Sequence, residues 1–228
     1  MEARSEARVA PESLESLPSI SYRALTLAIA GIALYVLLDV VAQLLPPHYS
    51  PISQAESDLA VGPYGYVMAI NFVVRGFLTF AFLVGLIGAT HLGARARVGV
   101  ALLAIWGLGA LILAVFPTDV GSVVTVHGTI HNLTALVAFL GGAFGTLLLS
   151  FHFHGEPRLR TLEPVARAIA GLAVVMFFVT GAGFFVHRLS SIFGLLERIF
   201  IGLVLVWMLV VALELLRSSR TPLTTAPG

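Results

Sequence analysis

The chain has 228 residues, of which 58% are hydrophobic and 11% are charged, and its mean hydropathy is +0.97. Soluble domains carry charge at roughly a quarter of their positions, so this composition excludes an ordinary soluble domain. The formal net charge of +1 excludes the basic surface that nucleic-acid binding requires, and the absence of cysteine excludes disulfide bonds, cysteine-bound zinc and iron–sulfur clusters.

Residues 1–21 form a first segment that mixes Arg, Glu, Pro and Ser and contains no apolar stretch typical of a cleaved signal peptide. We therefore expect a disordered tail, followed by a first apolar run that acts as its own membrane signal. Six apolar runs follow, and each is close to the ~20 residues that a spanning helix needs. They cover residues 22–45, 63–90, 98–116, 127–151, 165–185 and 195–216, before a second expected disordered tail over 217–228.

Short connections join these runs, so consecutive helices are expected to lie antiparallel and side by side. The sequence therefore predicts an all-α membrane protein, with one six-helix bundle over residues 22–216 built from three antiparallel hairpins. Most of the arginines lie on the side of the two termini, whereas the opposite side carries Arg188 and Arg198. Cytoplasmic segments are enriched in Lys and Arg, so both termini and both tails are expected in the cytoplasm.

The choice of basic residues also indicates the kind of organism that encodes the chain. All thirteen are Arg, and the apolar residues are rich in Ala, Gly, Leu and Val. We interpret this bias as that of a GC-rich bacterial coding sequence. The expected location is therefore a bacterial inner membrane.

Polar residues that are unusual in such a bundle gather toward the three outer connections, residues 46–62, 117–126 and 187–194. Charged groups inside spans are costly and normally face a partner or a cavity, so Asp39 and Arg75 are candidates to pair with each other. The inner half of the bundle has nothing comparable. The outer set comprises Asp39, Asp58, Asn71, Arg75, Asp119, His127, His131, His187, Glu197 and Arg198.

Two interpretations of this outer set are open. Polar groups that converge between helices are typical of a ligand pocket in a bundle. Helix caps and ion pairs that only hold the outer helix ends together would use the same residue types.

A metal site is a more specific alternative, because His127 and His131 lie four residues apart and would share one face of a helix. Zinc at this pair would need a third ligand and an open position for water. The chain contains no H-E-x-x-H motif, so interfacial histidines without a metal are favoured. The candidate third ligands are His187, Asp119 and Asp58, and the candidate general base is Glu197.

Haem is the other cofactor that histidines on facing helices bind, as axial ligands. His131 with His187, and His91 with His152, would be the two pairs. We disfavour haem because His91 and His152 lie at the ends of spans next to arginines, where solvated histidine is ordinary.

Small residues predict where the helices approach most closely. Gly141 and Gly145 form a G-x-x-x-G step on the fourth run, and the Thr-Gly-Ala-Gly stretch over residues 180–183 narrows the fifth. We expect both to be helix contact surfaces.

Three stretches resemble a known bacterial family of six-span proteins, the domain of unknown function 998. They are S-P-I-S-Q-A-E-S-D-L-A-V-G-P-Y-G-Y-V-M-A-I-N over Ser50–Asn71, F-P-T-D at Phe116–Asp119 followed by G-T-I-H-N at Gly128–Asn132, and G-L-L-E-R-I at Gly194–Ile199. The family has no settled activity, so the resemblance implies the fold and little about function. It favours Asp58, Asn71, Asp119, His131, Asn132, Glu197 and Arg198 as site residues over His127, which lies outside these motifs.

The favoured function is the binding of a lipid or small amphiphile in an outer pocket, or a role as a helical subunit of a larger membrane assembly. Membrane lipids and other membrane subunits are accordingly the expected partners. The alternative is a metal-dependent hydrolase of a lipid amide or ester, with His131 and Asp119 as ligands and Glu197 as base. A transporter comes third. A substrate path needs polar groups on both sides of the midplane, and here they are expected only in the outer half. Whether the protein is an enzyme is left open.

Overall fold

A computed structural model describes residues 17–121, 123–183 and 185–219, without the side chain of His187. The chain in these ranges is helical and contains no strand. The long helices are α1 (Ser19–Leu44), α2 (Gly65–Ala89), α3 (Ala94–Leu113), α4 (Val126–His152), α5 (Glu163–Ala182) and α7 (Phe193–Ser218). The short ones are α6 (His187–Ser190) and the 3-10 helices η1 (Glu56–Ala60) and η2 (Phe153–Gly155). All six long helices are long and apolar enough to cross a membrane, which confirms the predicted multi-pass, all-α fold.

The ends of the helices differ from the predicted ones by a few residues. α2 begins at Gly65 rather than at residue 63, because residues 62–65 form a turn in which Gly62 has a φ of +100°. The N–H of Gly65 donates to the Gly62 carbonyl at 3.1 Å. Most of the predicted tails lies outside the described residues, although α1 already begins at Ser19 and α7 ends at Ser218.

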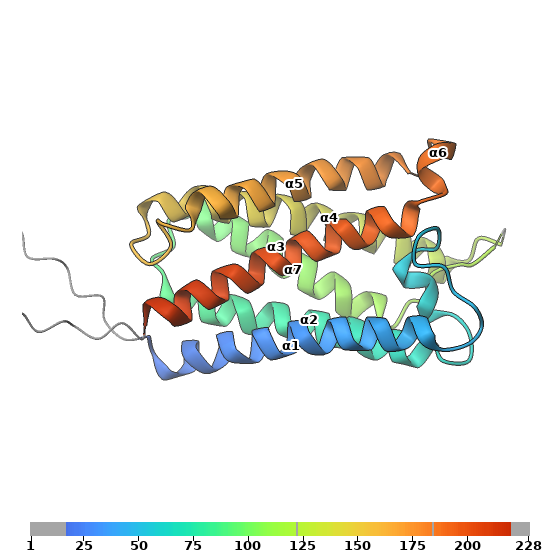
Figure 1. The fold of residues 1–228 in the computed structure, drawn as a ribbon, viewed down its shortest axis with the longest axis horizontal. Helices are drawn as coiled ribbons and strands as arrows, with labels where there is room; N and C mark the ends of the chain where they lie inside the picture. Colours follow the sequence, from blue (N-terminus) through green and yellow to red (C-terminus); the bar gives the residue numbers. More distant parts are fainter. Residues whose placement is uncertain (1–16, 122, 184, 220–228) are drawn as a thin grey trace, which may run out of the picture.

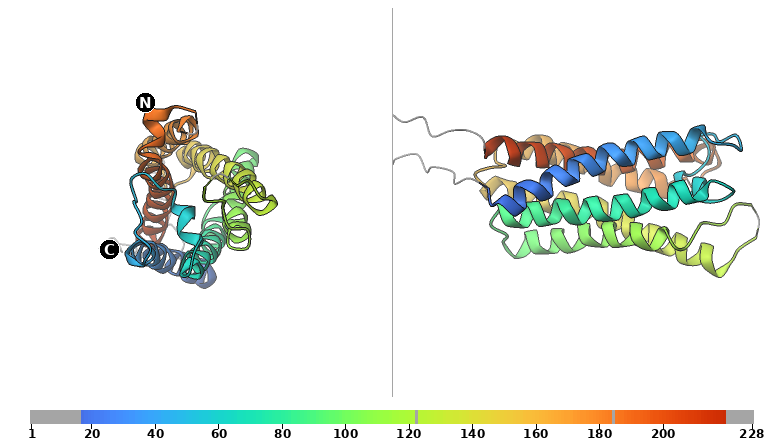
Figure 2. Two further views of the ribbon diagram at one scale, coloured as in Figure 1. Left: turned by 90° about the vertical axis from the view of Figure 1, so that its right-hand side faces the viewer. Right: turned by 90° about the horizontal axis from the view of Figure 1, so that it is seen from below.

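The six long helices form a closed ring in chain order, with α7 completing it between α5 and α1 (Figures 1 and 2). The described chain begins and finishes at one end of this ring, called here the terminal end (Figure 1). The opposite end, called the distal end, carries the connections over residues 45–64, 114–125 and 183–192. The end-on view in Figure 2 shows η1, drawn in cyan, inside the ring at the distal end. Residues 45–64 therefore place a short helix against the inner faces of the long ones.

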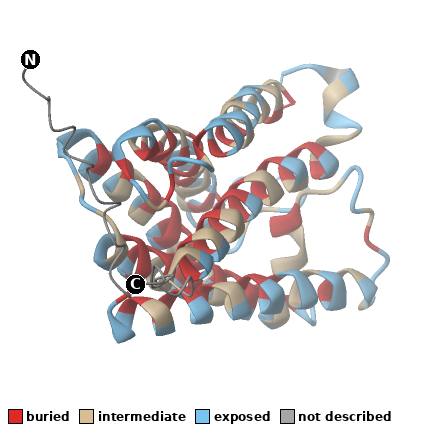
Figure 3. Cartoon of the chain, turned by 60° about the vertical axis from the view of Figure 1, so that its left-hand side comes forward, coloured by how far each residue is buried: buried red, intermediate tan, exposed pale blue. Residues whose placement is uncertain are grey.

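Buried residues run along the inner faces of the helices (Figure 3). The largest of them include Trp106, Trp207 and Phe200, and the Trp207 ring stacks on Phe153 with 5.7 Å between ring centroids. Large apolar side chains such as Leu37, Phe77 and Leu133 are exposed on the outside. Apolar residues on the outer surface as well as in the core are typical of helices that face lipid.

Close packing of α3 and α4 depends on glycine, as the G-x-x-x-G step predicts. A Cβ at Gly141 would lie 2.5 Å from the Leu102 carbonyl oxygen, and one at Gly145 would lie 2.9 Å from the Leu103 nitrogen. The prediction for residues 180–183 is wrong at Gly181, where a Cβ would meet no atom within 4 Å. Gly181 borders empty space rather than a neighbouring helix.

The terminal end has a polar network of its own, contrary to the expectation that the inner half has nothing comparable. Glu156 is buried and accepts the backbone N–H of His91 at 3.0 Å, while Nε2 of His152 donates to the His91 carbonyl at 2.8 Å. Glu163 pairs with Arg167 at 2.7 Å. The first two contacts fasten the 90–93 connection to the end of α4 and the segment after it, and the third lies within α5. The sequence did not reveal them because Glu156 lies in an irregular segment, where no periodic pattern indicates burial.

Candidate functional site

A cavity of about 570 Å³ lies at the distal end, between η1, α2, α4, α5 and α7. Ligand pockets typically have volumes of roughly 300–1,000 Å³, so this cavity has the size of a binding site. Its walls are largely apolar and aromatic. Polar lining residues come from η1, α2 and α7, and also from the 114–125 connection, α4 and α5. The principal apolar lining residues are Phe72, Leu113, Leu136, Phe139, Phe177, Phe178, Phe185, Phe193 and Ile201.

The exposed part of the cavity wall lies on the side of α4 and α5. The exposed lining residues lie on or directly after these two helices: Asn132, Leu136, Phe178 and Phe185. Those on α2 and α7, such as Phe72 and Glu197, are buried. α4 and α5 diverge toward the distal end in Figure 2, and Gly181 on α5 leaves the space beside it empty. The opening therefore faces the surroundings of the bundle at the level of the spans.

Two buried carboxyl groups form the cavity wall at η1. The Tyr35 hydroxyl on α1 donates to the Glu56 carboxylate, and the backbone N–H of Glu56 donates to Glu197 Oε2 at 2.6 Å. This chain of contacts ties α1 and α7 to η1 and explains why η1 lies inside the ring. Burial raises the pKa of the Glu56 carboxyl above its ordinary value, and the negative charge of Asp39 raises it further, whereas Arg75 opposes the shift.

Arg75 lies deepest among the charged lining residues and is only 1% exposed. None of its three guanidinium nitrogens has a hydrogen-bond partner within the part of the chain that the structure describes. Its Cζ atom lies 4.6 Å from the centroid of the Trp106 ring, 5.1 Å from that of Phe72 and 6.0 Å from that of Tyr35. Arg75 thus stands in an aromatic cage, which we call the Arg75 cage, and one side of it borders the cavity.

The predicted pairing of Arg75 with Asp39 is wrong. Asp39 Oδ1 lies 3.6 Å from Arg198 Nη2, and Asp39 Oδ2 accepts from Gln43 at 2.6 Å. Asp39 pairs with Arg198 because α7 packs against α1 in the ring, whereas Arg75 on α2 faces the ring interior. Asn71 and Thr79 lie four residues before and after Arg75 and are buried on the same face of α2.

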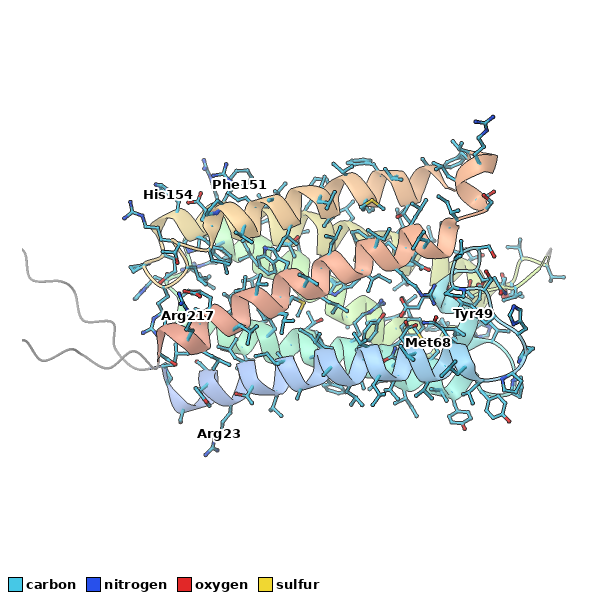
Figure 4. All side chains as sticks on the ribbon, in the orientation of Figure 1. Arg23, Tyr49, Met68, Phe151, His154 and Arg217 are labelled. Carbon is cyan, nitrogen blue, oxygen red and sulfur yellow. The ribbon has the colours of Figure 1, made fainter. Side chains whose placement is uncertain are left out.

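Arg198 holds the connection before η1 onto α7. Its Nη2 donates to the Tyr49 hydroxyl at 2.9 Å, and that hydroxyl donates to the carbonyls of Gln54 and Ala55 at 2.8 and 2.7 Å. Its Nη1 donates to the Pro51 carbonyl at 3.3 Å. We call Arg198, Asp39, Tyr49 and these carbonyls the Arg198 clamp; Figure 4 shows Tyr49 at the distal end, among the loops.

His131 on α4 borders the cavity and is held by the connection before this helix. Its Nδ1 lies 2.7 Å from the Phe116 carbonyl, which only accepts, so Nδ1 carries a proton and donates this hydrogen bond. His127 is exposed, with its ring centroid 5.6 Å from that of Phe116, and does not line the cavity. One turn of helix therefore separates a buried histidine from an exposed one.

Asp119 anchors the connection that leads into α4. The backbone N–H and the hydroxyl of Thr125 donate to its two carboxylate oxygens at 2.8 and 2.7 Å, and these contacts hold the pKa of Asp119 below its ordinary value. Thr125 caps α4 in turn, by accepting from the N–H of Gly128 at 3.1 Å. A Cβ at Gly128 would overlap the Asp119 carboxyl group, so any side chain here would displace Asp119 from Thr125.

The candidate metal ligands are not brought together. His131 faces the cavity, His127 packs on Phe116, both oxygens of Asp119 are engaged by Thr125, and the side chain of His187 lies outside the described residues. Among the described residues, no group of three or more His, Asp or Glu side chains is placed to hold a metal ion. Zinc stays an untested alternative from the sequence, and haem stays a disfavoured one.

The two remaining predicted site residues, Asp58 and Asn132, line the cavity as well. Asp58 also faces a smaller recess of about 240 Å³ beneath the 45–64 connection, and burial raises the pKa of its carboxyl. Asn132 is exposed, on the same helix as Leu136. The cavity therefore collects six of the nine predicted network residues: Asp58, Arg75, Asp119, His131, Asn132 and Glu197. Asn71 is buried one turn from Arg75, and Asp39 and Arg198 belong to the clamp.

Sequence reasoning missed the aromatic part of the site and two tyrosines. Tyr35 lies four residues before Asp39, a spacing that places both on one face of α1 and was the available signal. The pair Phe177-Phe178 gave no such signal, because aromatic residues in an apolar span are ordinary. Trp106 is distinguished only by its contact with Arg75.

Fold and cavity together define a multi-pass membrane protein with a side-opening cavity in the distal half of its helix bundle. The chain matches the family described as "Protein of unknown function (DUF998)" over residues 29–214, and it belongs to that family. This range begins within α1, ends within α7 and includes every cavity residue. No curated protein and no solved structure matches the chain.

Proposed function

We propose that this protein binds a lipid or a small amphiphile in the distal cavity. The observation that carries the proposal is the cavity itself, which combines aromatic walls, a buried polar side and an opening between two membrane-spanning helices. An apolar chain is favoured against walls such as Phe139, Phe177 and Phe178. A polar headgroup is favoured at η1, α2 and α7.

The position of the opening supports an amphiphile over a water-soluble ligand. Exposed lining residues such as Leu136 and Phe178 belong to α4 and α5, whose outer surfaces are apolar. A lipid in the surrounding bilayer would reach the cavity without leaving the membrane. Trp207 is fully buried and lies further along α7 toward the terminal end than the lining residue Ile201, which supports a binding site over a transport path.

The location follows from the arginines. We place the protein in a bacterial inner membrane, with both termini in the cytoplasm and the cavity in the outer half of the bilayer. Two reporters fused after Gly228 test this orientation. One that works only in the cytoplasm should be active, and activity of one that works only outside the cytoplasm would contradict the proposed orientation. A subunit role and the hydrolase alternative stay predictions of the sequence.

The binding proposal is tested by mass spectrometry of lipid that remains with the purified protein. Gly181→Leu places a side chain in the cavity, where a Cβ meets no atom within 4 Å. Gly171→Leu is the matched control, because it lies on the same helix, also has no atom within 4 Å of a Cβ, and does not line the cavity.

The expected result is bound lipid in the wild type and in Gly171→Leu, with a loss in Gly181→Leu. The proposal is wrong if the wild type retains no lipid or amphiphile, or if both leucine variants retain as much as the wild type.

A further inference from the structure

Arg75 is a buried cation whose hydrogen bonds are unmade. Its side chain carries five N–H donors and stays charged in proteins. It is 1% exposed, and the described residues supply no acceptor to Nε, Nη1 or Nη2. A buried charge without such partners is strongly unfavourable, and residues of this kind occur where a function requires them.

The aromatic cage explains how the charge is tolerated but leaves its donors free. The faces of Trp106, Phe72 and Tyr35 attract the cation, with Cζ-to-centroid distances of 4.6, 5.1 and 6.0 Å. Ring faces do not replace directional acceptors at the guanidinium edge. The indole Nε1 of Trp106 is a further buried donor without a partner, so this part of the molecule has a surplus of donors.

The carboxyl groups in the cavity wall do not supply the missing acceptors. The Glu56 carboxylate accepts the Tyr35 hydroxyl, and Glu197 Oε2 accepts the Glu56 backbone N–H. Burial raises the pKa of Glu56, which favours its neutral form. Asp119 lies in the connection before α4, with both oxygens engaged by Thr125. Arg75 is thus the cavity's permanently charged group with free hydrogen-bonding capacity.

Resting on the proposed function, we propose that the bound amphiphile is anionic, and that Arg75 binds its oxyanion headgroup, a carboxylate or a phosphate. The planar guanidinium forms paired hydrogen bonds with either group. The apolar chain then lies against Phe139, Phe177 and Phe178 and points toward the opening between α4 and α5. A cationic headgroup would face Arg75 with a like charge.

The test uses one chain length and four headgroups: dodecanoate, dodecyl phosphate, dodecanol and dodecylamine. Binding to the full-length protein in phosphatidylcholine nanodiscs is followed by tryptophan fluorescence, because Trp106 lies against the guanidinium. Each variant is compared with the wild type for each amphiphile, which removes differences in partition into the bilayer. Arg75→Met removes the charge, Arg75→Gln keeps a polar group should the methionine variant fold poorly, and Arg188→Met is the control on the exposed helix α6.

We expect either Arg75 variant to weaken binding of dodecanoate, dodecyl phosphate or both by about tenfold or more, as loss of a charge-assisted hydrogen bond does. Dodecanol binding should be unchanged, and Arg188→Met should bind all four as the wild type does. A larger effect on dodecanoate identifies a fatty-acid ligand, and one on dodecyl phosphate identifies a phosphate ester.

Equal effects on all four amphiphiles, or none, would overturn the headgroup assignment while leaving amphiphile binding intact. If the wild type binds none of the four and Gly181→Leu leaves its retained lipid unchanged, the proposed function itself is wrong.

Discussion

The Arg198 clamp and the Arg75 cage place the same residue type in the same half of the bundle under opposite conditions. Both Nη nitrogens of Arg198 donate, one to backbone carbonyls and the other to Tyr49, and Asp39 lies 3.6 Å away. Arg75 has aromatic rings around it, and the described residues offer no acceptor to any of its three guanidinium nitrogens. In the clamp only Nε of Arg198 lacks such a partner, so Arg198 makes most of its hydrogen bonds within the protein, whereas those of Arg75 are left for another molecule.

The two arginines show how structural and functional polar residues in this bundle can be told apart by their effect on stability. Removing one partner from a satisfied buried pair leaves an uncompensated charge and is strongly destabilising. Replacing an unsatisfied buried charge by an apolar group of similar shape removes an unfavourable term. Stability should therefore respond in opposite directions at the two arginines.

The largest expected effect is at the clamp. Arg198→Met should destabilise the protein by about 3 kcal/mol, because Asp39 loses its ion pair and the loop carbonyls lose their donor. Thermal unfolding in detergent measures the change, with Arg188→Met as the control for loss of one positive charge. A midpoint equal to that of the control would show that the clamp does not hold the distal end.

A smaller effect is expected at Tyr49, whose hydroxyl links the clamp to the loop. Tyr49→Phe removes one acceptor for Arg198 and the donor to the Gln54 and Ala55 carbonyls, at a cost of about 1–2 kcal/mol. The variant should add little to Arg198→Met, since both act on one network. Full additivity in the double variant would mean that the two residues act independently.

A pH-dependent effect is expected at Glu56, in the wall between clamp and cage. Its folded-state pKa is raised, so the folded protein binds more protons than the unfolded chain once pH exceeds the ordinary value of 4.5. Stability should fall as pH rises from that value through the raised pKa. In Glu56→Gln, which keeps an acceptor for Tyr35, this part of the pH dependence should disappear. Identical pH profiles of the thermal midpoint would contradict it.

The helices, the α3–α4 contact and the gathering of polar residues at one end could be predicted from the sequence, because each depends on a local pattern. Hydropathy defines the spans, and the spacing of Gly141 and Gly145 defines a smooth helix face. The partner of Asp39 could not be predicted, because it depends on α7 closing the ring against α1.

The lack of hydrogen-bond partners at Arg75 could not be predicted from the sequence either. Its lack of a partner depends on where Glu56 and Glu197 point, and that depends on η1 lying inside the ring. A short helix in a polar connection gives no pattern that places it there. The cavity has the same origin, since it is the space that η1 and the diverging ends of α4 and α5 leave unfilled (Figure 2).

The most direct measurement of this account is the thermal unfolding of Arg75→Met beside the wild type, after exhaustive removal of lipid by detergent and again with added dodecanoate or dodecyl phosphate. Without ligand, Arg75→Met should be as stable as the wild type or more stable. With ligand, the wild type should gain stability and the variant should not. A ligand-free loss as large as that of Arg198→Met, with equal ligand stabilisation of both proteins, would show that Arg75 is a structural residue and would contradict the account.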